Sequence, residues 1–579
     1  MWRFRWAGHC VTQASRTGFR RLGLAVVIAI SALCTTGAAT AQIPGGLPST
    51  VEPGRDRSSP AIPAQPKFDF RIETPSRSSV PRAVDEIRFR LNGIQINGAV
   101  TLPASSFSGL YQKLIGKDVS LSDILDVAGE IENQYRRAGY ILVRAFVPPQ
   151  RVADGIFMIN VVEGFIANVV IEGGKAGTRN RIRTYLEPAR TSKPLQLRAI
   201  EEALLLANDL PGVTAAGVLR PSPDTVGASE LVVTMPDNPI AGRFAIDNRG
   251  SRYSGLWSAT ANVTINSVFD DEDQIEGSAA GTLDASPLRR AFGQLRYRRP
   301  VGEQGGLLSM IGTITHGEPG STLQAFNVLT DSWAVGPRFT FPLKRTRAET
   351  ILLEAGFTAQ SARVNILGTP LSHDDWRVLD FGISYLSNGF LGGAWVANLD
   401  VAQGLPILGA SDNGAPDLSR VGGRVDFTKF SGGMRFTRPI AGPFEIMLAA
   451  QGQYAVNPLL IGEQFAFGGS QIGRGYDTGG ITGDHGVGGT VELRYDPQLR
   501  IPAVQALQPY AFYDKAGVWN VQNNGLPGQS VSSVGGGIRA WLDHEIFGGI
   551  EVVHTLEPVP GSDGGRRATK LLLNASVGF

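Results

Sequence analysis

Alternating apolar and polar residues dominate the chain from about residue 240 to its end. The alternation runs in segments of roughly ten residues, which turn residues and longer loops separate. There are about sixteen such segments, and a closed antiparallel barrel in a bacterial outer membrane needs an even number of strands. A soluble β-sandwich is the alternative, but it does not usually need ~340 residues in one piece. The pattern therefore predicts a 16-stranded antiparallel transmembrane β-barrel over residues 238–579.

Charged residues within these segments predict which face of a strand looks into the barrel. In TVELRYD, Glu492 and Arg494 share one face, and the other face holds Val491, Leu493 and Tyr495. Successive side chains of a strand point to opposite faces, and a charge that faces lipid destabilises a barrel. We therefore expect Glu492 and Arg494 to face the lumen.

A helical period appears only before the barrel, in residues 83–237. After the strand EIRFRLNGIQI, Ser120 can cap a helix that ends at Gly139. One stripe of this helix is apolar at helical spacing and consists of Leu121, Ile124, Leu125, Ala128, Ile131 and Tyr135. Two strands follow, and residues 164–237 repeat the plan with a strand, two helices and two strands. Because this is an internal repeat, we predict two β-α-α-β-β domains, at 83–163 and 164–237.

The N-terminal residues have the character of a secretory leader. Arginines precede the apolar run LGLAVVIAISAL, and Ala39-Thr40-Ala41 fits an A-x-A cleavage site, which predicts a signal peptide over residues 1–41. A retained anchor is the alternative, but the apolar run is shorter than the ~20 residues that span a bilayer. Residues 42–82 are polar and rich in proline, so we expect an extended or disordered linker.

The C-terminal residues KLLLNASVGF alternate up to the final Phe579. A chain that ends within an amphipathic strand on phenylalanine resembles the closing strand of bacterial outer-membrane barrels. We therefore assign Phe579 as the membrane-assembly signal. An ordinary edge strand is the alternative interpretation of this segment.

Composition and motifs argue against several other classes of protein. Both cysteines, Cys10 and Cys34, lie in the leader, so we expect no disulfide or thiol chemistry. Without the leader's five arginines, 49 basic residues stand against 52 acidic ones, which gives no indication of nucleic-acid binding. The chain has no G-x-S-x-G, and its six histidines form no H-E-x-x-H. We expect no enzyme activity, no metal site and no cofactor.

The stretch QIGRGYDTGGITGDHG, residues 471–486, places one cation, Arg474, between glycines. It lacks the spacing of a dinucleotide fingerprint and of a Walker motif. A phosphate loop also needs a helix N-terminus behind it, whereas GVGGTVELRY follows here and alternates like a strand. A nucleotide site is therefore rejected.

These segments together resemble a family, the outer-membrane transporters of two-partner secretion, which are the haemolysin and filamentous-haemagglutinin secretion/activation proteins. The resemblance extends over nearly all of the chain after about residue 83. Its motifs are AGYILVRAFVPPQRVADGIFMINVVEG (138–164) in the first polypeptide-transport-associated (POTRA) domain, DNRGSRYSG (247–255) at the start of the barrel, Arg474-Gly475-Tyr476 in the sixth extracellular loop, and Phe512-Tyr513-Asp514 in the strand that pairs with this loop.

The resemblance implies that the sixth loop folds back into the barrel as a lock that gates the pore. Arg474, Gly475 and Tyr476 supply the loop side of this lock. Asp514, which is charged in mid-strand and expected to face inward, is the partner of Arg474, with Glu492 nearby. The family usually has valine where this chain has Gly473, which predicts a looser loop tip.

The resemblance also implies a function. The two POTRA domains would lie in the periplasm and catch an unfolded partner exoprotein of adhesin or haemolysin type, and the barrel would export it. We expect the exoprotein to add a strand to an exposed edge, with Tyr140, Leu142 and Arg144 of YILVRAFV as its binding residues. The other expected partners are outer-membrane lipid and the barrel-assembly machinery, and the protein is expected to be a monomer.

Two other classes of barrel remain as alternatives at this point. An insertase that builds other barrels shares the R-G-Y loop and the POTRA domains, but it usually carries more of these domains than two. A diffusion porin would lack the repeat at 83–237, and a metal-chelate receptor would carry a plug domain with a different pattern.

Overall fold

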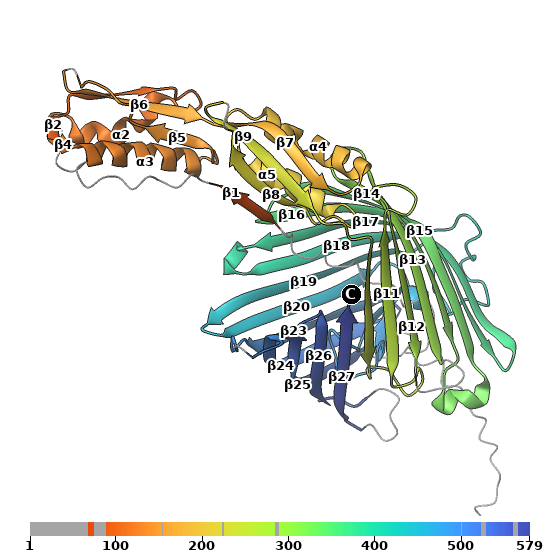
Figure 1. Ribbon diagram of the computed structural model, residues 1–579. Helices are drawn as coiled ribbons and strands as arrows, with labels where there is room; N and C mark the ends of the chain where they lie inside the picture. Colours follow the sequence, from red (N-terminus) through yellow and green to blue (C-terminus); the bar gives the residue numbers. More distant parts are fainter. Residues whose placement is uncertain are drawn as a thin grey trace, which may run out of the picture. The chain divides into compact units, whose positions relative to one another are not determined.

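The computed structural model describes residues 68–73, 88–152, 154–222, 225–283, 289–499, 501–522, 528–559 and 566–579. The predicted signal peptide, residues 1–41, lies outside these ranges, as does most of the predicted linker. Within the described part of the chain, no helix is both long and apolar enough to cross a bilayer. Figure 1 labels the helices and strands in the order of the sequence.

The first folded unit contains a three-stranded sheet of order β3-β6-β5 and a separate pair, β2-β4. The bounds of its elements are β2 Arg88–Arg90, β3 Gly93–Asn97, η2 Ala104–Phe107, α2 Ser108–Tyr111, η3 Gln112–Leu114, β4 Asp118–Ser120, α3 Leu121–Arg137, β5 Val143–Phe146 and β6 Ile156–Glu163. The first helix of the predicted plan is thus a single turn, α2, between two 3₁₀ turns. Serine and glycine are frequent in this segment, and both are weak helix formers.

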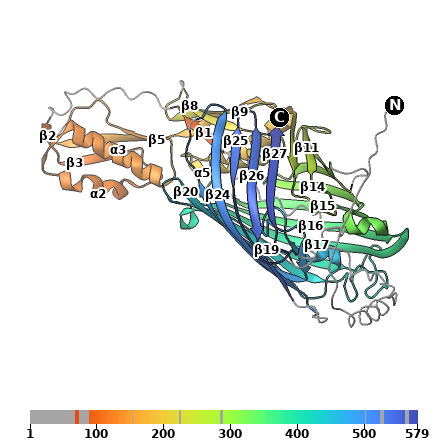
Figure 2. The ribbon, with the colours of Figure 1, turned by 90° about the horizontal axis from the view of Figure 1, so that it is seen from below.

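Helix α3 begins where the sequence predicts. The Ser120 side chain accepts from the Asp123 N–H and the Asp123 carboxylate accepts from the Ser120 N–H, which makes a capping box. Its apolar stripe, which includes Ile131 and Tyr135, packs against Phe157 and other buried residues of the sheet. Figure 2 shows α3 lying along this sheet. The spacing of apolar residues therefore determines both the helix and the face that it buries.

The second unit follows the predicted plan more closely. The bounds of its elements are β7 Phe165–Gly173, α4 Ala176–Thr191, α5 Leu197–Asp209, β8 Ala216–Pro221 and β9 Ala228–Met235. Its sheet has the order β1-β8-β9-β7, and β1 (Asp69–Ile72) lies within the predicted linker. β1 runs parallel to β8, and Phe68 and Phe70 pack against the core of this unit. The linker prediction thus needs correction here, because burial of two phenylalanines favours a paired strand.

Sixteen antiparallel strands form a closed barrel, as the alternation predicts. Their bounds are β10 Ile240–Asp247, β11 Ser258–Asn266, β12 Gln274–Thr282, β13 Arg290–Val301, β14 Gly306–Gly317, β15 Leu329–Arg345, β16 Glu349–Ile366, β17 Thr369–Asn388, β18 Ala394–Leu405, β19 Thr428–Ala441, β20 Phe444–Ala455, β23 His485–Tyr495, β24 Val504–Trp519, β25 Gln529–Leu542, β26 Ile546–Thr555 and β27 Thr569–Gly578. Three 3₁₀ turns lie in the loops, at η4 Ser321–Phe326, η5 Phe390–Gly392 and η6 Ile461–Glu463. A barrel of sixteen strands is wide enough to enclose an aqueous channel.

The two faces of β23 carry the side chains that the alternation predicts. Val491, Leu493 and Tyr495 are exposed on the outer wall, whereas Glu492 is fully buried. The Arg494 guanidinium donates to Glu492 at 2.7 Å, so Glu492 and Arg494 both lie on the inner face. The barrel keeps its charges inside because a charge on the lipid face is destabilising.

The barrel closes where its first strand meets its last. β10 pairs with β27, and Phe244 lies opposite Val577 in the register. Beyond β27, the N–H of Phe579 donates to the Gly242 carbonyl and the N–H of Gly242 donates to the Phe579 carbonyl, each at 3.0 Å. A Cβ on Gly242 would lie 2.3 Å from the Phe579 ring, so the ring lies against this glycine. The last residue therefore takes part in the closing seam.

Deleting Phe579 should lower the amount of folded protein in the outer membrane. The deletion removes two backbone hydrogen bonds of the seam and the terminal ring. The measurement is the heat-modifiable folded band in outer-membrane fractions, with Phe579→Tyr as the matched control because it keeps the backbone bonds and an aromatic ring. Equal amounts of folded protein with and without Phe579 would remove its role in assembly.

Candidate functional site

The segment between β20 and β23, residues 456–484, is loop 6, and it carries Arg474. It contains a small ribbon of β21 (Phe465–Phe467) and β22 (Ile481–Gly483). Arg474 is only 5% exposed, because its neighbours hold it against the inner wall. Gly473 has φ +78°, a conformation that favours glycine. A Cβ on Gly475 would lie 2.7 Å from Thr555, so only glycine permits this close approach.

The Arg474 guanidinium makes a two-pronged contact with Asp514 on β24. Its Nε lies 3.1 Å from Oδ2 and its Nη2 lies 2.9 Å from Oδ1. Nη1 donates to Glu492 at 2.8 Å, and Nη2 also donates to Thr490 at 2.9 Å. The sequence predicts that Arg474 pairs with Asp514 close to Glu492, and the structure brings these three side chains together.

The main chain of the loop tip adds to this contact. The N–H groups of Gly473 and Arg474 both donate to Oδ2 of Asp514, at 3.1 Å and 3.0 Å. Asp514 therefore binds the backbone of the loop as well as the arginine. The glycine at position 473 does not loosen the tip in this structure, because its positive φ aims the N–H at the carboxylate.

Further charged residues on neighbouring strands join the contact between Arg474, Asp514 and Glu492. Together they form a network, the Arg474 cluster, that the sequence alone does not predict. Glu492 accepts from Arg494 and from Arg539, each at 2.7 Å. Glu551 lies 3.6 Å from the Arg474 guanidinium. The Arg474 cluster consists of Arg474, Glu492, Asp514, Arg494, Arg539 and Glu551, from loop 6 and strands β23 to β26. These strands are drawn in blue in Figure 1 and are neighbours in the barrel.

Aromatic residues cover the cluster. The Arg474 guanidinium lies 3.3 Å from the centre of the Phe512 ring, which permits a cation–π contact. Tyr476 is 2% exposed, and its hydroxyl lies 3.0 Å from the carbonyl oxygens of Ser532 and Glu557. Tyr476 thus anchors loop 6 to the wall at a second point. Tyr510 donates to Glu551 at 2.7 Å and shields the far end of the cluster.

Removing one member of this network is costly because the others stay buried. The side chains of Arg474, Glu492 and Asp514 are 4%, 1% and 0% exposed. Breaking a buried ion pair by removing one partner costs about 3–5 kcal/mol, since a charge is left without compensation. Among the described residues, no three His, Cys, Asp or Glu side chains are grouped as a metal site requires.

The predicted exoprotein-binding residues lie in and just before β5. Tyr140 bridges to Gln196 of the second unit, and Leu142 packs against the core of that unit. Arg144 is the one of the three that lies on β5 itself, 3.9 Å from the Glu132 carboxylate. The alternation of YILVRAFV predicts the strand but does not reveal that its first residues are already in contact with another domain.

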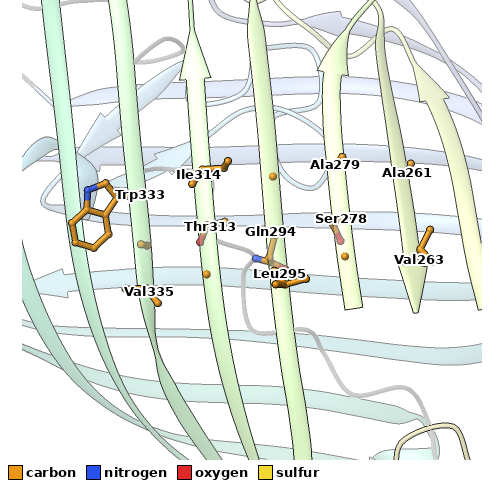
Figure 3. Close-up of a pocket in the computed structure, with 14 residues that line it drawn as sticks. Ala261, Val263, Ser278, Ala279, Gln294, Leu295, Thr313, Ile314, Trp333 and Val335 are labelled. Atoms are coloured by element: carbon orange, nitrogen blue, oxygen red, sulfur yellow. The ribbon is translucent and has the colours of Figure 1, made fainter. Parts of the chain in front are cut away.

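A shallow hollow of about 640 Å³ lies on the outer face of β11 to β15 (Figure 3). Glycine and alanine, such as Gly277 and Ala279, form its floor, and Leu295, Ile314 and Trp333 rise around it. Its lining carries no charged side chain. The hollow therefore belongs to the lipid-facing surface and is separate from the Arg474 cluster.

Comparison with known families identifies two regions of the chain. Residues 227–540 match haemolysin secretion/activation protein ShlB/FhaC/HecB, and residues 89–164 match the POTRA domain of ShlB type. The first match covers more than half of the 579 residues.

Individual relatives are distant but are matched over most of their length. Identity is 26% over 405 residues with the hemolysin transporter protein ShlB of Serratia marcescens, covering 68% of this chain and 70% of the relative. It is 24% over 420 residues with the outer membrane transporter CdiB of Escherichia coli O6:K15:H31, covering 69% and 67%. It is 22% over 446 residues with the heme/hemopexin transporter protein HuxB of Haemophilus influenzae, covering 74% and 76%.

Solved structures share the fold. CdiB from Escherichia coli superposes with a TM-score of 0.65 at 21% identity, covering 88% of this chain and 92% of that one. BamA from Haemophilus ducreyi lacking POTRA domains 1–3 superposes with a TM-score of 0.52 at 14% identity, covering 85% and 100%. At such identities these likenesses concern the architecture.

Arg474→Ala and Asp514→Ala should each raise the conductance of the purified channel in planar bilayers, because loop 6 loses its hold on the wall. The double variant should conduct little more than either single variant, since residues in one network are non-additive, whereas independent sites add within ~0.5 kcal/mol. Arg338→Ala is the matched control: Arg338 pairs with Asp380 at 2.9 Å on other strands and does not contact loop 6.

A charge swap sharpens this test. Arg474→Asp combined with Asp514→Arg should recover part of the closed state if attraction between the two charges holds the loop. Recovery stays partial because arginine's planar fork needs its own geometry. Strictly additive effects together with no recovery in the swapped variant would mean that the two residues act independently.

Proposed function

Because the chain belongs to the family of haemolysin secretion/activation proteins ShlB/FhaC/HecB, we propose that it exports a partner protein across the outer membrane. The cargo is an unfolded exoprotein of adhesin or haemolysin type, which the POTRA domains receive in the periplasm and the barrel conducts outward. The relatives ShlB and CdiB are named as transporters. Membership of this family also makes the protein an outer-membrane transporter with periplasmic POTRA domains.

The observation that carries the proposal is a closed barrel with a loop bound to its inner wall. Sixteen strands enclose a lumen that is wide enough for an aqueous channel. Arg474 of loop 6 is bound within it by Asp514 and Glu492. A conduit for an extended polypeptide needs a pore that is blocked at rest and opens for its cargo. In this proposal the Arg474 cluster keeps the pore blocked at rest, because it holds loop 6 in place as a lock.

Release of this lock accompanies export in our proposal. Arg474 has more than one acceptor, because Glu492 and Glu551 lie beside Asp514. Loop 6 can therefore leave Asp514 while the guanidinium keeps a carboxylate. Such stepwise exchange lowers the barrier to opening, since the arginine is never buried without a counter-charge.

Recruitment of the exoprotein is proposed at β5, which lies at the edge of its sheet. The N–H of Ala145 donates to the Glu132 carboxylate on α3 at 3.0 Å, so it points away from the β6 partner strand. An incoming strand can take the place of Glu132 as the acceptor, which is the geometry of strand addition. Arg144 is half-exposed beside this edge and offers a charge to the same segment.

A rigid platform stands behind this edge. The Tyr135 hydroxyl of α3 donates to Glu163 of β6 at 2.6 Å, and the Thr101 hydroxyl donates to the same carboxylate at 2.8 Å. Burial alone would raise the pKa of Glu163, but these hydrogen bonds outweigh it and the pKa is lowered. Burial and the contact with Glu163 raise the pKa of Tyr135. The bond therefore persists at neutral pH and fixes α3 on the sheet.

Assembly of other barrels is the second candidate function. It has the support of the fold shared with BamA. The family match is to the secretion/activation proteins, and two POTRA-like units precede the barrel in the described part of the chain, fewer than an insertase usually has. Both observations favour export.

Deleting residues 83–163 should abolish secretion and leave the barrel in the membrane. The barrel strands begin at Ile240 and close on themselves without this unit. The measurements are exoprotein in the culture medium and the heat-modifiable band in the outer membrane. Continued export by the truncated protein would remove the recruiting role of this unit.

A single substitution tests the edge itself. Ala145→Pro removes the outward N–H while leaving the bonds between β5 and β6 intact, and proline is tolerated on edge strands in this position. Secretion should fall severely with a normal amount of barrel in the membrane. Ala145→Val, the matched control, keeps the N–H and should secrete normally. Equal secretion by both variants would rule out strand addition at this edge.

A further inference from the structure

One cation of the inner wall stands apart from the ion pairs around it. Arg435 lies on β19, and its side chain is exposed to the lumen. Among the described residues, no carboxylate lies within ion-pairing distance of Arg435, whereas Arg494, Arg539 and Arg474 each have one. A charge inside a barrel finds a counter-charge or faces water, and Arg435 faces the lumen, so its guanidinium is accessible to a charged group that enters the barrel.

The register places Arg435 at the same height as the loop-6 contact. Arg435 lies opposite Ala449 of β20, Ala449 lies opposite Thr490 of β23, and Thr490 lies opposite Asp514 of β24. Ala449 is short, so it leaves space between Arg435 and the cluster. The unpaired cation is thus directed into a gap beside the residues that hold Arg474.

This gap is a pocket of about 210 Å³, lined by both polar and apolar residues. Four arginines line it: Arg435, Arg474, Arg494 and Arg539. Amide side chains, including Asn398 and Gln471, supply further hydrogen-bonding groups. Glu492 is the one carboxylate among the lining residues, and it is already bound by three arginines. The pocket therefore has an excess of positive charge.

We propose that this pocket binds carboxylate side chains of the polypeptide in transit, with Arg435 as its principal contact. The inference rests on the proposed export function, because that function supplies an extended polypeptide within the lumen. Arginine favours carboxylates through charge-assisted, two-pronged hydrogen bonds. A carboxylate that enters also lies close to Arg494 and Arg539, which hold Glu492 beside Arg474. Acidic residues of the cargo thus bind where the lock is held.

The test uses the purified full-length protein in planar bilayers, with hexaglutamate as the probe. Hexaglutamate should reduce the current, and Arg435→Gln should weaken this block about tenfold. Hexalysine should not block, and higher salt should weaken the effect of hexaglutamate because it screens the charges. Arg438→Gln is the matched control: it makes the same charge change on the same strand, in the outward-facing register with Met434.

A second variant covers the case in which Arg435→Gln does not assemble. Ala449→Asp places a carboxylate on the strand next to Arg435, within the gap, and should abolish the block by occupying the site. Ala449→Asn adds a side chain of the same size without the charge and should keep most of the block. The proposal is overturned if hexaglutamate blocks the Ala449→Asp channel as strongly as it blocks the Ala449→Asn and native channels. It is also overturned if hexalysine blocks the native channel as well as hexaglutamate does.

A small dicarboxylate separates a polypeptide site from a general anion site. Glutarate at the same carboxylate concentration should block far less than hexaglutamate, because a peptide engages the pocket through several linked charges. Equal block by glutarate would overturn the assignment to polypeptide cargo. Because these currents are recorded without the exoprotein, failure of the pocket is distinguishable from failure of export, which is measured in the culture medium.

Discussion

The arrangement of the lumen depends on one buried guanidinium. Arg474 is enclosed by the inner wall, and an isolated charge in such a place would be strongly unfavourable. The structure compensates it with Asp514, Glu492 and Thr490 from two adjacent strands. Those strands must be in one register for the three groups to converge. The requirement extends to loop 6, since the positive φ at 473 favours glycine and a Cβ at 475 would lie 2.7 Å from Thr555.

The alternation of the strands explains why the compensating charges are available at all. A charge on an outer wall that faces lipid is destabilising, so charged residues such as Glu492, Arg494 and Asp514 are turned inward. The inner wall thereby gathers both signs: Arg338 lies between Glu354 and Asp380, while Arg494 and Arg539 share Glu492. These ion pairs give the inner wall a polar lining where they lie. The same constraint that makes the barrel stable in a membrane therefore also makes its interior suitable for a polar conduit.

Local patterns in the sequence predict the elements well, and the contacts between distant segments poorly. Alternation is a local property, so it predicts sixteen strands and the inward direction of Glu492. Pairing between strands is non-local, and for that reason the sequence does not reveal that Arg539 and Glu551 join the cluster, although both are charged in mid-strand. The strand β1 was missed for a similar reason, because its partner β8 lies far along the chain. Leu142 packs against a neighbouring unit, which no period in YILVRAFV can show.

The composition of the Arg474 cluster is consistent with firm but reversible binding of loop 6. A single ion pair, equally buried, would hold loop 6 firmly. When loop 6 withdrew, however, both charges would lose their partner, and breaking a buried pair costs about 3–5 kcal/mol. In the cluster, two of the three arginines lie near more than one carboxylate, since Arg474 contacts Glu492 and lies 3.6 Å from Glu551, and Arg494 contacts both Glu492 and Glu445. When loop 6 withdraws, Asp514 keeps Ser533 as a donor and Glu492 keeps two arginines. The charges left behind thus remain partly compensated, and the lock that we propose needs this property if it is to open for a cargo and close again.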